Sequence, residues 1–210
     1  MRTALSKISL LSIILLLAAG CTRGESVTTP EADPVDASSL TDFDGNTYPA
    51  LQIGEQVWMG ANLLATHGPE GKPVESFCYD DQEENCLTYG RLYTVSAAMG
   101  GDRGEGSQGI CPDGWHIPSM SEWKTLIDHL GGQDTAGQAL REQSGMGLQP
   151  SGWFDFTGEY RGLGEATFLR SSSAPNSYST YIWMLEPGSD SVERGDLHPD
   201  DAIPLRCVRD

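Results

Sequence analysis

Four acidic side chains lie close together between two cysteines, in the segment Cys78–Cys86, and their carboxylates could coordinate a hard cation. They are Asp80, Asp81, Glu83 and Glu84. Calcium takes about six to eight oxygen ligands, and no calcium-loop spacing is present, so other ligands would have to come from elsewhere in the chain. The alternative is a solvated acidic surface. The sequence therefore predicts calcium as the one candidate cofactor, and otherwise none.

Cys21 is a second candidate for chemistry, because it follows a segment typical of export. The chain begins with the basic residues Arg2 and Lys7, continues with the apolar run Ile8–Ala19, and then reaches Cys21. A basic start, an apolar run and small residues before a cleavage point are typical of a secretory signal. A cysteine at that point is typical of a bacterial lipoprotein, in which the thiol is acylated with fatty acids such as palmitate. We expect a signal peptide over residues 1–20 and a lipid on Cys21; the alternatives are an ordinary signal peptide and, less favoured for so short a run, a transmembrane helix.

The other four cysteines form the third chemical set. An even number of cysteines in an exported chain is typical of disulfides, and four cysteines can pair in three ways. In one of these pairings Cys78 closes a short loop with Cys86, and Cys111 ties the middle of the chain to Cys207 near its end. Zinc is disfavoured, because the chain has no Cys-x-x-Cys pair. We expect disulfides at these four positions and no free thiolate for catalysis.

The segment after Cys21 and the overall charge limit the partners of the chain. Residues 21–40 are rich in Thr, Ser, Pro, Glu and Asp and lack aromatic residues, which predicts a flexible tether. The chain has a net charge of −17, and loss of residues 1–20 leaves 11 basic against 30 acidic residues, a net charge of −19. Such a charge disfavours binding to nucleic acid. We expect a protein of the cell envelope, attached to a membrane by its lipid at the outer membrane or the cell surface.

The catalytic motifs that occur in the chain lack the context that their chemistry needs. Gly104–Gly109 matches a dinucleotide-binding G-x-G-x-x-G, but no helix follows it to receive a pyrophosphate. Ser121–Lys124 matches S-x-x-K without the partner motifs of a serine acyl-enzyme. The four histidines show no metal-binding spacing, and His116, between two apolar residues, is expected to be structural. The sequence therefore predicts that the protein is not an enzyme.

The elements that would position these residues are predicted in the order strands, helices, strands. Leu40–Asn62 reads as strands joined by tight turns, and Thr180–Leu185 and Ile203–Val208 are the clearest later strands. Helices are predicted over Leu92–Met99 and, more weakly, over Asp134–Gln143. This order predicts an α+β fold, and the length predicts one domain over residues 41–210.

The strongest single element is a helix that begins after Ser119. Ser119 and Glu122 form the sequence pattern of a capping box, and an apolar face follows at helical spacing until two glycines end the helix at Gly131. Three tryptophans in apolar surroundings are expected in the core, whereas two tyrosines in polar segments are expected to be exposed. The tryptophans are Trp58, Trp123 and Trp183, and the tyrosines are Tyr160 and Tyr178.

Several ordered segments of the chain resemble one family, the Fibrobacter succinogenes major paralogous domain. The resemblance covers residues 41–210 and is weakest between Gly145 and Asp201. The segments that carry it are Asp42–Tyr48, Ile53–Met59, Ala61–Leu63, Cys78–Asp81, Asn85–Cys86, Tyr89–Thr94, Ala97–Met99, Cys111–Ser119, Glu122–Trp123 and Leu205–Asp210.

The resemblance implies a fold and a location more than a chemistry. Members of the family are found on exported lipoproteins and other surface proteins, in agreement with Cys21. It implies a C-type lectin-like domain with short antiparallel strands, two to three helices and neighbouring termini. The segment Trp115–Trp123 is similar to the helix entry of sulfatase-modifying domains, which share that fold. No activity is established for the family, and a fold does not give a function.

Three functions follow as expectations. The first is a lipid-anchored envelope protein whose lectin-like domain binds a glycan, a peptide or a protein partner without catalysis, through the loop-rich region Trp153–Asp201. The second is a structural subunit of a cell-surface or fimbria-like assembly. The third, more remote, is an enzyme on the sulfatase-modifying scaffold, which would need a reactive, copper-binding cysteine pair at Cys111 and Cys207. The sequence does not name the ligand-binding residues.

Overall fold

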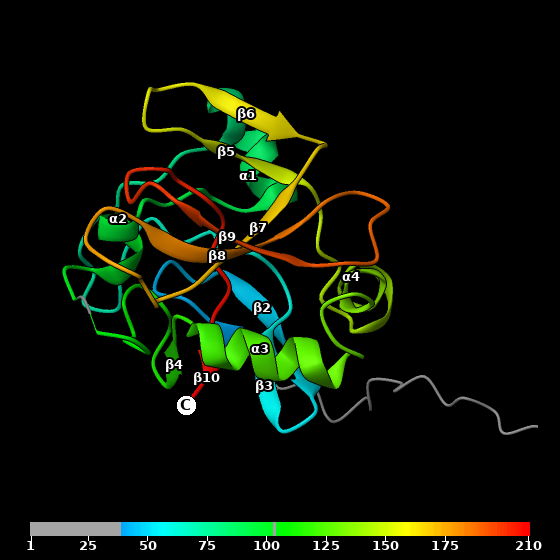
Figure 1. Ribbon diagram of the computed structural model, residues 1–210. Helices are drawn as coiled ribbons and strands as arrows, with labels where there is room; N and C mark the ends of the chain where they lie inside the picture. The colour runs from blue at the N-terminus through cyan, green and yellow to red at the C-terminus, as the bar shows by residue number, and fades with distance from the viewer. Residues whose placement is uncertain (1–38, 103) are drawn as a thin grey trace, which may run out of the picture.

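The computed structural model describes residues 39–102 and 104–210 of the chain (Figure 1). They form a mixed α+β structure with antiparallel strands and a few short helices, as predicted at this level. Cys21, the signal peptide and most of the tether lie outside the described residues. The first strand begins at Ser39, at the end of the segment predicted as the tether. No helix of the described part has the length and hydropathy to cross a membrane.

A five-stranded sheet forms the centre of the fold. Its strands lie in the order β1, β2, β3, β10 and β4, and every neighbouring pair is antiparallel. The last strand of the chain is thus inserted between strands from the start and from the middle of the domain. The bounds are β1 (Ser39–Thr41), β2 (Thr47–Ile53), β3 (Gln56–Met59), β10 (Val208–Arg209) and β4 (Trp115–His116).

The central sheet contributes side chains to two cores, because successive side chains of a strand point to opposite faces. On β2, Tyr48 and Ala50 contribute to one core and Ile53 to the other. On β3, Met59 joins the first core and Trp58 the second. Both cores therefore hold the register of this sheet, since a slip by one residue would exchange the two sets.

Helix α3 (Met120–His129) packs against the second core and begins with the predicted capping box. The Ser119 hydroxyl accepts the backbone N–H of Glu122, and the Glu122 carboxylate accepts the backbone N–H of Ser119. The ring of Trp123 packs at a tilt against Trp58 with 4.3 Å between ring centroids, and both are wholly buried. The helix lies in front of β3 and β10 in Figure 1.

Two smaller sheets follow in the second half of the chain. One pairs β5 with β6, and the other has the order β7, β8, β9. Leu169 of β7 and Trp183 of β8 pack into the same core as α3, which joins the second of these sheets to the central one. The bounds are β5 (Ser151–Phe154), β6 (Tyr160–Leu163), β7 (Thr167–Arg170), β8 (Thr180–Leu185) and β9 (Glu193–Leu197).

The remaining helical segments are short. The predicted helix over Leu92–Met99 begins only after Thr94, whose hydroxyl accepts the N–H of Ala97, and it ends as predicted at Gly100. The predicted helix over Asp134–Gln143 is present as a short α-helix that continues into a π-helical turn. The bounds are η1 (Tyr79–Asp81), α1 (Glu83–Tyr89), α2 (Val95–Met99), α4 (Ala136–Gln138) and η2 (Ala139–Gln143).

The prediction of a continuous strand over Ile203–Val208 is wrong, because only Val208 continues as a strand. Pro204 has no N–H to donate to a ladder. Single backbone bonds instead tie Cys207 to Met59, the last residue of β3, and Leu205 to Leu63. The buried side chain of Arg206 donates to Asn62 and to two backbone carbonyls, so this segment is held by side-chain contacts where a ladder was expected.

Candidate functional site

A cavity of about 590 Å³ opens beside the loop that connects β7 to β8. We call it the β7–β8 loop pocket. Helix α2, the end of β7, the connecting loop and the segment after β9 meet there, and Figure 1 shows this loop in orange beside α2. Most of its lining residues belong to the loop-rich region Trp153–Asp201 that was predicted to hold a ligand, and the others come from residues 95–102. Its lining residues are Val95, Ser96, Met99, Gly101, Asp102, Arg170, Ser171, Ser172, Ala174, Asn176, Ser177, Tyr178, Ser179, Thr180, His198, Pro199 and Asp200.

One wall of the pocket is fixed by buried serines. Ser172 donates from its backbone N–H to the carbonyl of Pro118 (2.8 Å), and its hydroxyl accepts the N–H of Gly106 (2.9 Å). The hydroxyl of Ser173 accepts the N–H of Met120 at 2.9 Å. These serines are almost wholly buried, so their hydroxyls are used to attach the loop to the start of α3. This wall is therefore rigid.

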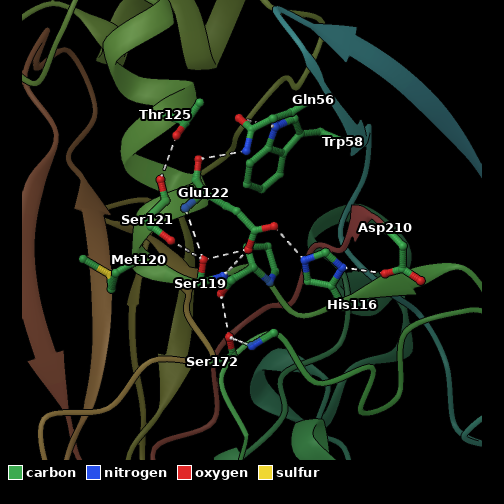
Figure 2. A network of polar contacts seen from close by, with 12 residues as sticks. Gln56, Trp58, His116, Ser119, Met120, Ser121, Glu122, Thr125, Ser172 and Asp210 are labelled. Carbon is green, nitrogen blue, oxygen red and sulfur yellow. Dashed lines mark hydrogen bonds and ion pairs between the residues drawn. The ribbon is translucent and has the colours of Figure 1, made fainter.

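The start of α3 is itself held by a network of charged groups (Figure 2). His116 lies between two carboxylates, with Nε2 at 2.7 Å from Glu122 and Nδ1 at 2.6 Å from Asp210. Because both ring nitrogens face acceptors, both must carry a proton for both bonds to form. Burial alone would lower the pKa of His116, but these two hydrogen bonds raise it above its ordinary value of 6.5.

This network does not have the geometry of a nucleophile with its base. The hydroxyl of Ser119 lies 2.7 Å from the carboxylate of Glu122, and both nitrogens of His116 are already bonded to carboxylates. Burial raises the pKa of Glu122, but the N–H and hydroxyl of Ser119 lower it below 4.5, so the carboxylate is ionised at neutral pH. The expectation that His116 is structural agrees with these contacts.

Arg170 is a nearly buried residue of the pocket lining. Its side chain is 2% exposed, and Nη2 donates to the backbone carbonyl of Tyr93 at 2.6 Å. Within the described residues, Nε and Nη1 are buried without a hydrogen-bond partner. Burial lowers the pKa of Arg170 to about 9, and Asp201 acts in the opposite direction, so the guanidinium is charged at neutral pH.

The opposite wall of the pocket is exposed. Tyr178, in the β7–β8 connection, is 80% exposed, as the sequence predicts. Its backbone N–H donates to the side chain of Asn176, which shapes the turn before it. In the segment after β9, the ring of His198 packs at a tilt against Phe156 with 4.8 Å between ring centroids. The buried carboxylate of Asp201 accepts the backbone N–H groups of both residues. The lining therefore presents the ring of Tyr178 and the partly exposed side chain of His198 to solvent.

The four carboxylates predicted to bind calcium lie in and beside η1 and α1, and all are exposed. Asp81 accepts the Tyr160 hydroxyl at 2.5 Å, and Glu83 accepts Arg91 at 2.7 Å. Of the described residues, only Cys78, Glu83 and Cys86 bring three ligand-type atoms within 4.8 Å of one another. Asp80, Asp81, Glu83 and Glu84 thus do not converge on a common point, and the calcium site stays a prediction without geometric support.

Two disulfides join the cysteines as Cys78–Cys86 and Cys111–Cys207. This confirms the expected disulfides and selects one of the three pairings. The sulfurs beside Glu83 are therefore not thiolates, and a cysteine binds a metal ion through its thiolate. Cys111 and Cys207 are wholly buried in the first core, where the bridge ties the segment before β4 to the segment before β10.

The predicted exposure of the aromatic residues is correct except at Tyr160. The three tryptophans expected in the core are at most 6% exposed. The prediction that Tyr160 is exposed is wrong, because its ring packs against Tyr79 and Phe154 and its hydroxyl donates to Asp81. The polar sequence around Tyr160 forms a hairpin whose tip is exposed while the ring turns inward.

Sequence reasoning missed the two buried arginines. Arg170 ends an entirely buried strand, and Arg206 stands between two buried residues near the chain end. Each is fully enclosed, which lowers its pKa to about 9. An arginine within an otherwise apolar run is the only signal that could have singled them out, and it does not say which atoms the side chain meets.

Comparison with protein families identifies the chain. The model of the Fibrobacter succinogenes major domain matches residues 51–209. The chain belongs to the Fibrobacter succinogenes major domain family. The match includes both disulfides, helix α3 and all residues of the β7–β8 loop pocket, and so confirms the resemblance seen in the sequence. Neither a curated protein nor a solved structure matches the chain significantly.

Proposed function

We propose that this protein is a non-catalytic binding module of the bacterial cell envelope, with a C-type lectin-like domain anchored through a lipid on Cys21. The domain binds an external ligand, a glycan, a peptide or a protein partner, in the β7–β8 loop pocket. The tether of residues 21–40 gives the domain reach from the membrane. The protein acts by holding its ligand near the envelope, and it needs no metal to do so.

The observation that carries this proposal is the construction of the pocket. Ser172, in the lining, is tied to Gly106, and the neighbouring Ser173 is tied to the first residue of α3. Another part of the lining presents the exposed ring of Tyr178. A preorganised wall lowers the entropy cost of binding, and an exposed aromatic ring supplies a flat surface for a sugar ring or a side chain. The oxidised state of Cys111 and Cys207 supports a non-catalytic function over the sulfatase-modifying alternative.

A glycan and peptide array probed with the full-length protein tests the pocket. The informative variant is Tyr178→Ala, and the matched control is Phe43→Ala, because Phe43 is also exposed but lies outside this pocket. We expect Tyr178→Ala to lose the array signal and Phe43→Ala to keep it. An array without signal, or a signal that both variants keep, would reject the pocket as the binding site.

The anchor has its own test. We expect the protein isolated from its native membrane to carry a diacyl or triacyl mass on Cys21, and Cys21→Ser to release the protein from the membrane fraction. An unmodified Cys21 in the mature protein would remove the lipid anchor from the proposal. It would leave the pocket untouched, because the pocket lies wholly within residues 95–200.

A further inference from the structure

Resting on the proposed function, we infer that the ligand of the β7–β8 loop pocket is an acidic saccharide whose carboxylate pairs with Arg170. Its ring stacks on Tyr178, and its hydroxyl groups donate to polar groups of the exposed wall. Three features of the pocket carry this inference: a buried cation, an exposed ring, and acceptors between them.

The cation is the first feature. Nε and Nη1 of Arg170 have no hydrogen-bond partner within the described residues, although the side chain is only 2% exposed. A buried donor without a partner is costly, and this cost is largest for a charged group. The side chain nevertheless lines a cavity. An incoming carboxylate would satisfy one of these donors and balance the buried charge, which a neutral acceptor would not do.

The exposed ring is the second feature. Tyr178 is the most exposed large aromatic side chain of the described residues, at 80%. It stands in a short connection that is closed by an isolated bridge between Asn176 and Ser179. This bridge restricts the connection, so the ring is presented with limited freedom. A pyranose ring can lie on such a surface through its apolar C–H face.

The acceptors are the third feature. The side chain of Asp200 is 72% exposed at the rim, and the hydroxyls of Ser177 and Ser179 line the same wall. Sugar hydroxyls donate to carboxylates and serines, whereas a second anionic group would be repelled by Asp200. A ligand with one carboxylate and several hydroxyls therefore fits the pocket, and a multiply charged phosphate fits it less well.

The net negative charge of the chain does not prevent this binding. Exposed charges are screened beyond about 8 Å at physiological ionic strength. Arg170 is buried, so its field inside the pocket is screened much less. Long-range repulsion slows the approach of the ligand, and the contact inside the pocket decides the affinity.

Calorimetric titration of the full-length protein in detergent with a trisaccharide that carries a single carboxylate, on a terminal glucuronate, tests the inference. The comparison ligand is the methyl ester of the same trisaccharide, which keeps the rings and hydroxyls but lacks the charge. We expect the acid to bind and the ester to bind roughly 10- to 100-fold more weakly, because a hydrogen bond to a charged group contributes about that factor. Arg170→Met should reduce the affinity for the acid to that for the ester, and Arg170→Lys should retain part of it.

The dependence on pH gives a readout that a purely structural role of Arg170 would not produce. Because the pKa of Arg170 is lowered to about 9, binding of the acid should weaken as the pH rises through that value, whereas binding of the ester should not. The other titratable groups near Arg170 are Asp102, Asp200, His198 and Tyr178 in the pocket lining and Asp201 behind it. The ester meets the same groups, so it controls for their effect. The unfolding temperature of Arg170→Met, compared with wild type, establishes that the variant folds.

The outcomes separate this inference from the proposed function. Equal affinity for acid and ester, or full affinity of a folded Arg170→Met, would overturn the role of Arg170 while leaving the pocket as a binding site. Loss of binding in Tyr178→Ala would still support the pocket in that case. If the acid does not bind at all but another ligand on the array does, the inference fails and the proposed function stands. Absence of any ligand would reject both.

Discussion

Replacing the long-range disulfide should destabilise the domain far more than replacing the short-range one. Cys111 and Cys207 are 96 positions apart, whereas Cys78 and Cys86 are 8 apart. In the loop-entropy model, closing a loop of about 100 residues contributes roughly 4.7 kcal/mol, and a loop of about nine residues contributes roughly 2.5 kcal/mol. We therefore expect the double alanine variant of the long bridge to lose about 2 kcal/mol more than that of the short bridge.

The comparison is well matched, because each variant replaces two buried cysteines by alanine. Urea unfolding of the full-length protein, followed by tryptophan fluorescence, measures the free energy of unfolding. The slope against urea should also increase more for the variant without Cys111 and Cys207, since its unfolded chain is less restricted and exposes more surface. Equal losses for the two variants, or a larger loss for the short bridge, would refute the entropic argument and point to packing around the sulfurs as the dominant contribution.

Three further predictions concern other contacts. The folded-state pKa of His116 lies above 6.5, so stabilisation by its protonated ring is complete below about pH 6.5 and is lost as the pH rises through the raised pKa. His116→Gln removes the ion pair with Asp210 and should abolish this decline in the free energy of unfolding. A pH profile that is the same in the variant and in wild type would contradict the network. Arg206→Met should cost roughly 3 kcal/mol or more in urea unfolding, because it removes the donor to two buried carbonyls and to the half-buried Asn62. A loss below about 1 kcal/mol would show that these acceptors find water. Millimolar calcium should leave the unfolding temperature unchanged, because the carboxylates of the segment Cys78–Cys86 do not converge, and a rise of several degrees would restore the calcium site.

Helix α3 illustrates what local pattern predicts well. Its capping residues, its apolar face and its end are all encoded within about a dozen neighbouring positions, and the structure reproduces them. The strands β2 and β3 were predictable for the same reason, since a tight turn joins two alternating runs. The disulfide pairing was predictable only as one of three choices.

Helix α1 illustrates where local pattern fails. Acidic residues in the first turn favour a helix start, but the sequence between Cys78 and Cys86 looked like a loop that gathers carboxylates. The helical backbone and the ties to Tyr160 and Arg91 separate those carboxylates, and both ties come from other parts of the chain. The sequence shows which positions are acidic, but it does not show in which direction their side chains point.

The sequence by itself determined the family, the mixed class of the fold, the capped helix and the expectation of two disulfides, because each of these depends on residue order over short distances or on the presence of a motif. Only the tertiary structure decided which residues form the β7–β8 loop pocket. Arg170, Tyr178 and Asp200 lie on different segments, and Arg170 became part of a cavity surface only when β7 packed beside α2 and the loop after β9. Their chemistry depends on burial and on partners distant in the chain, and burial is a property of the folded molecule.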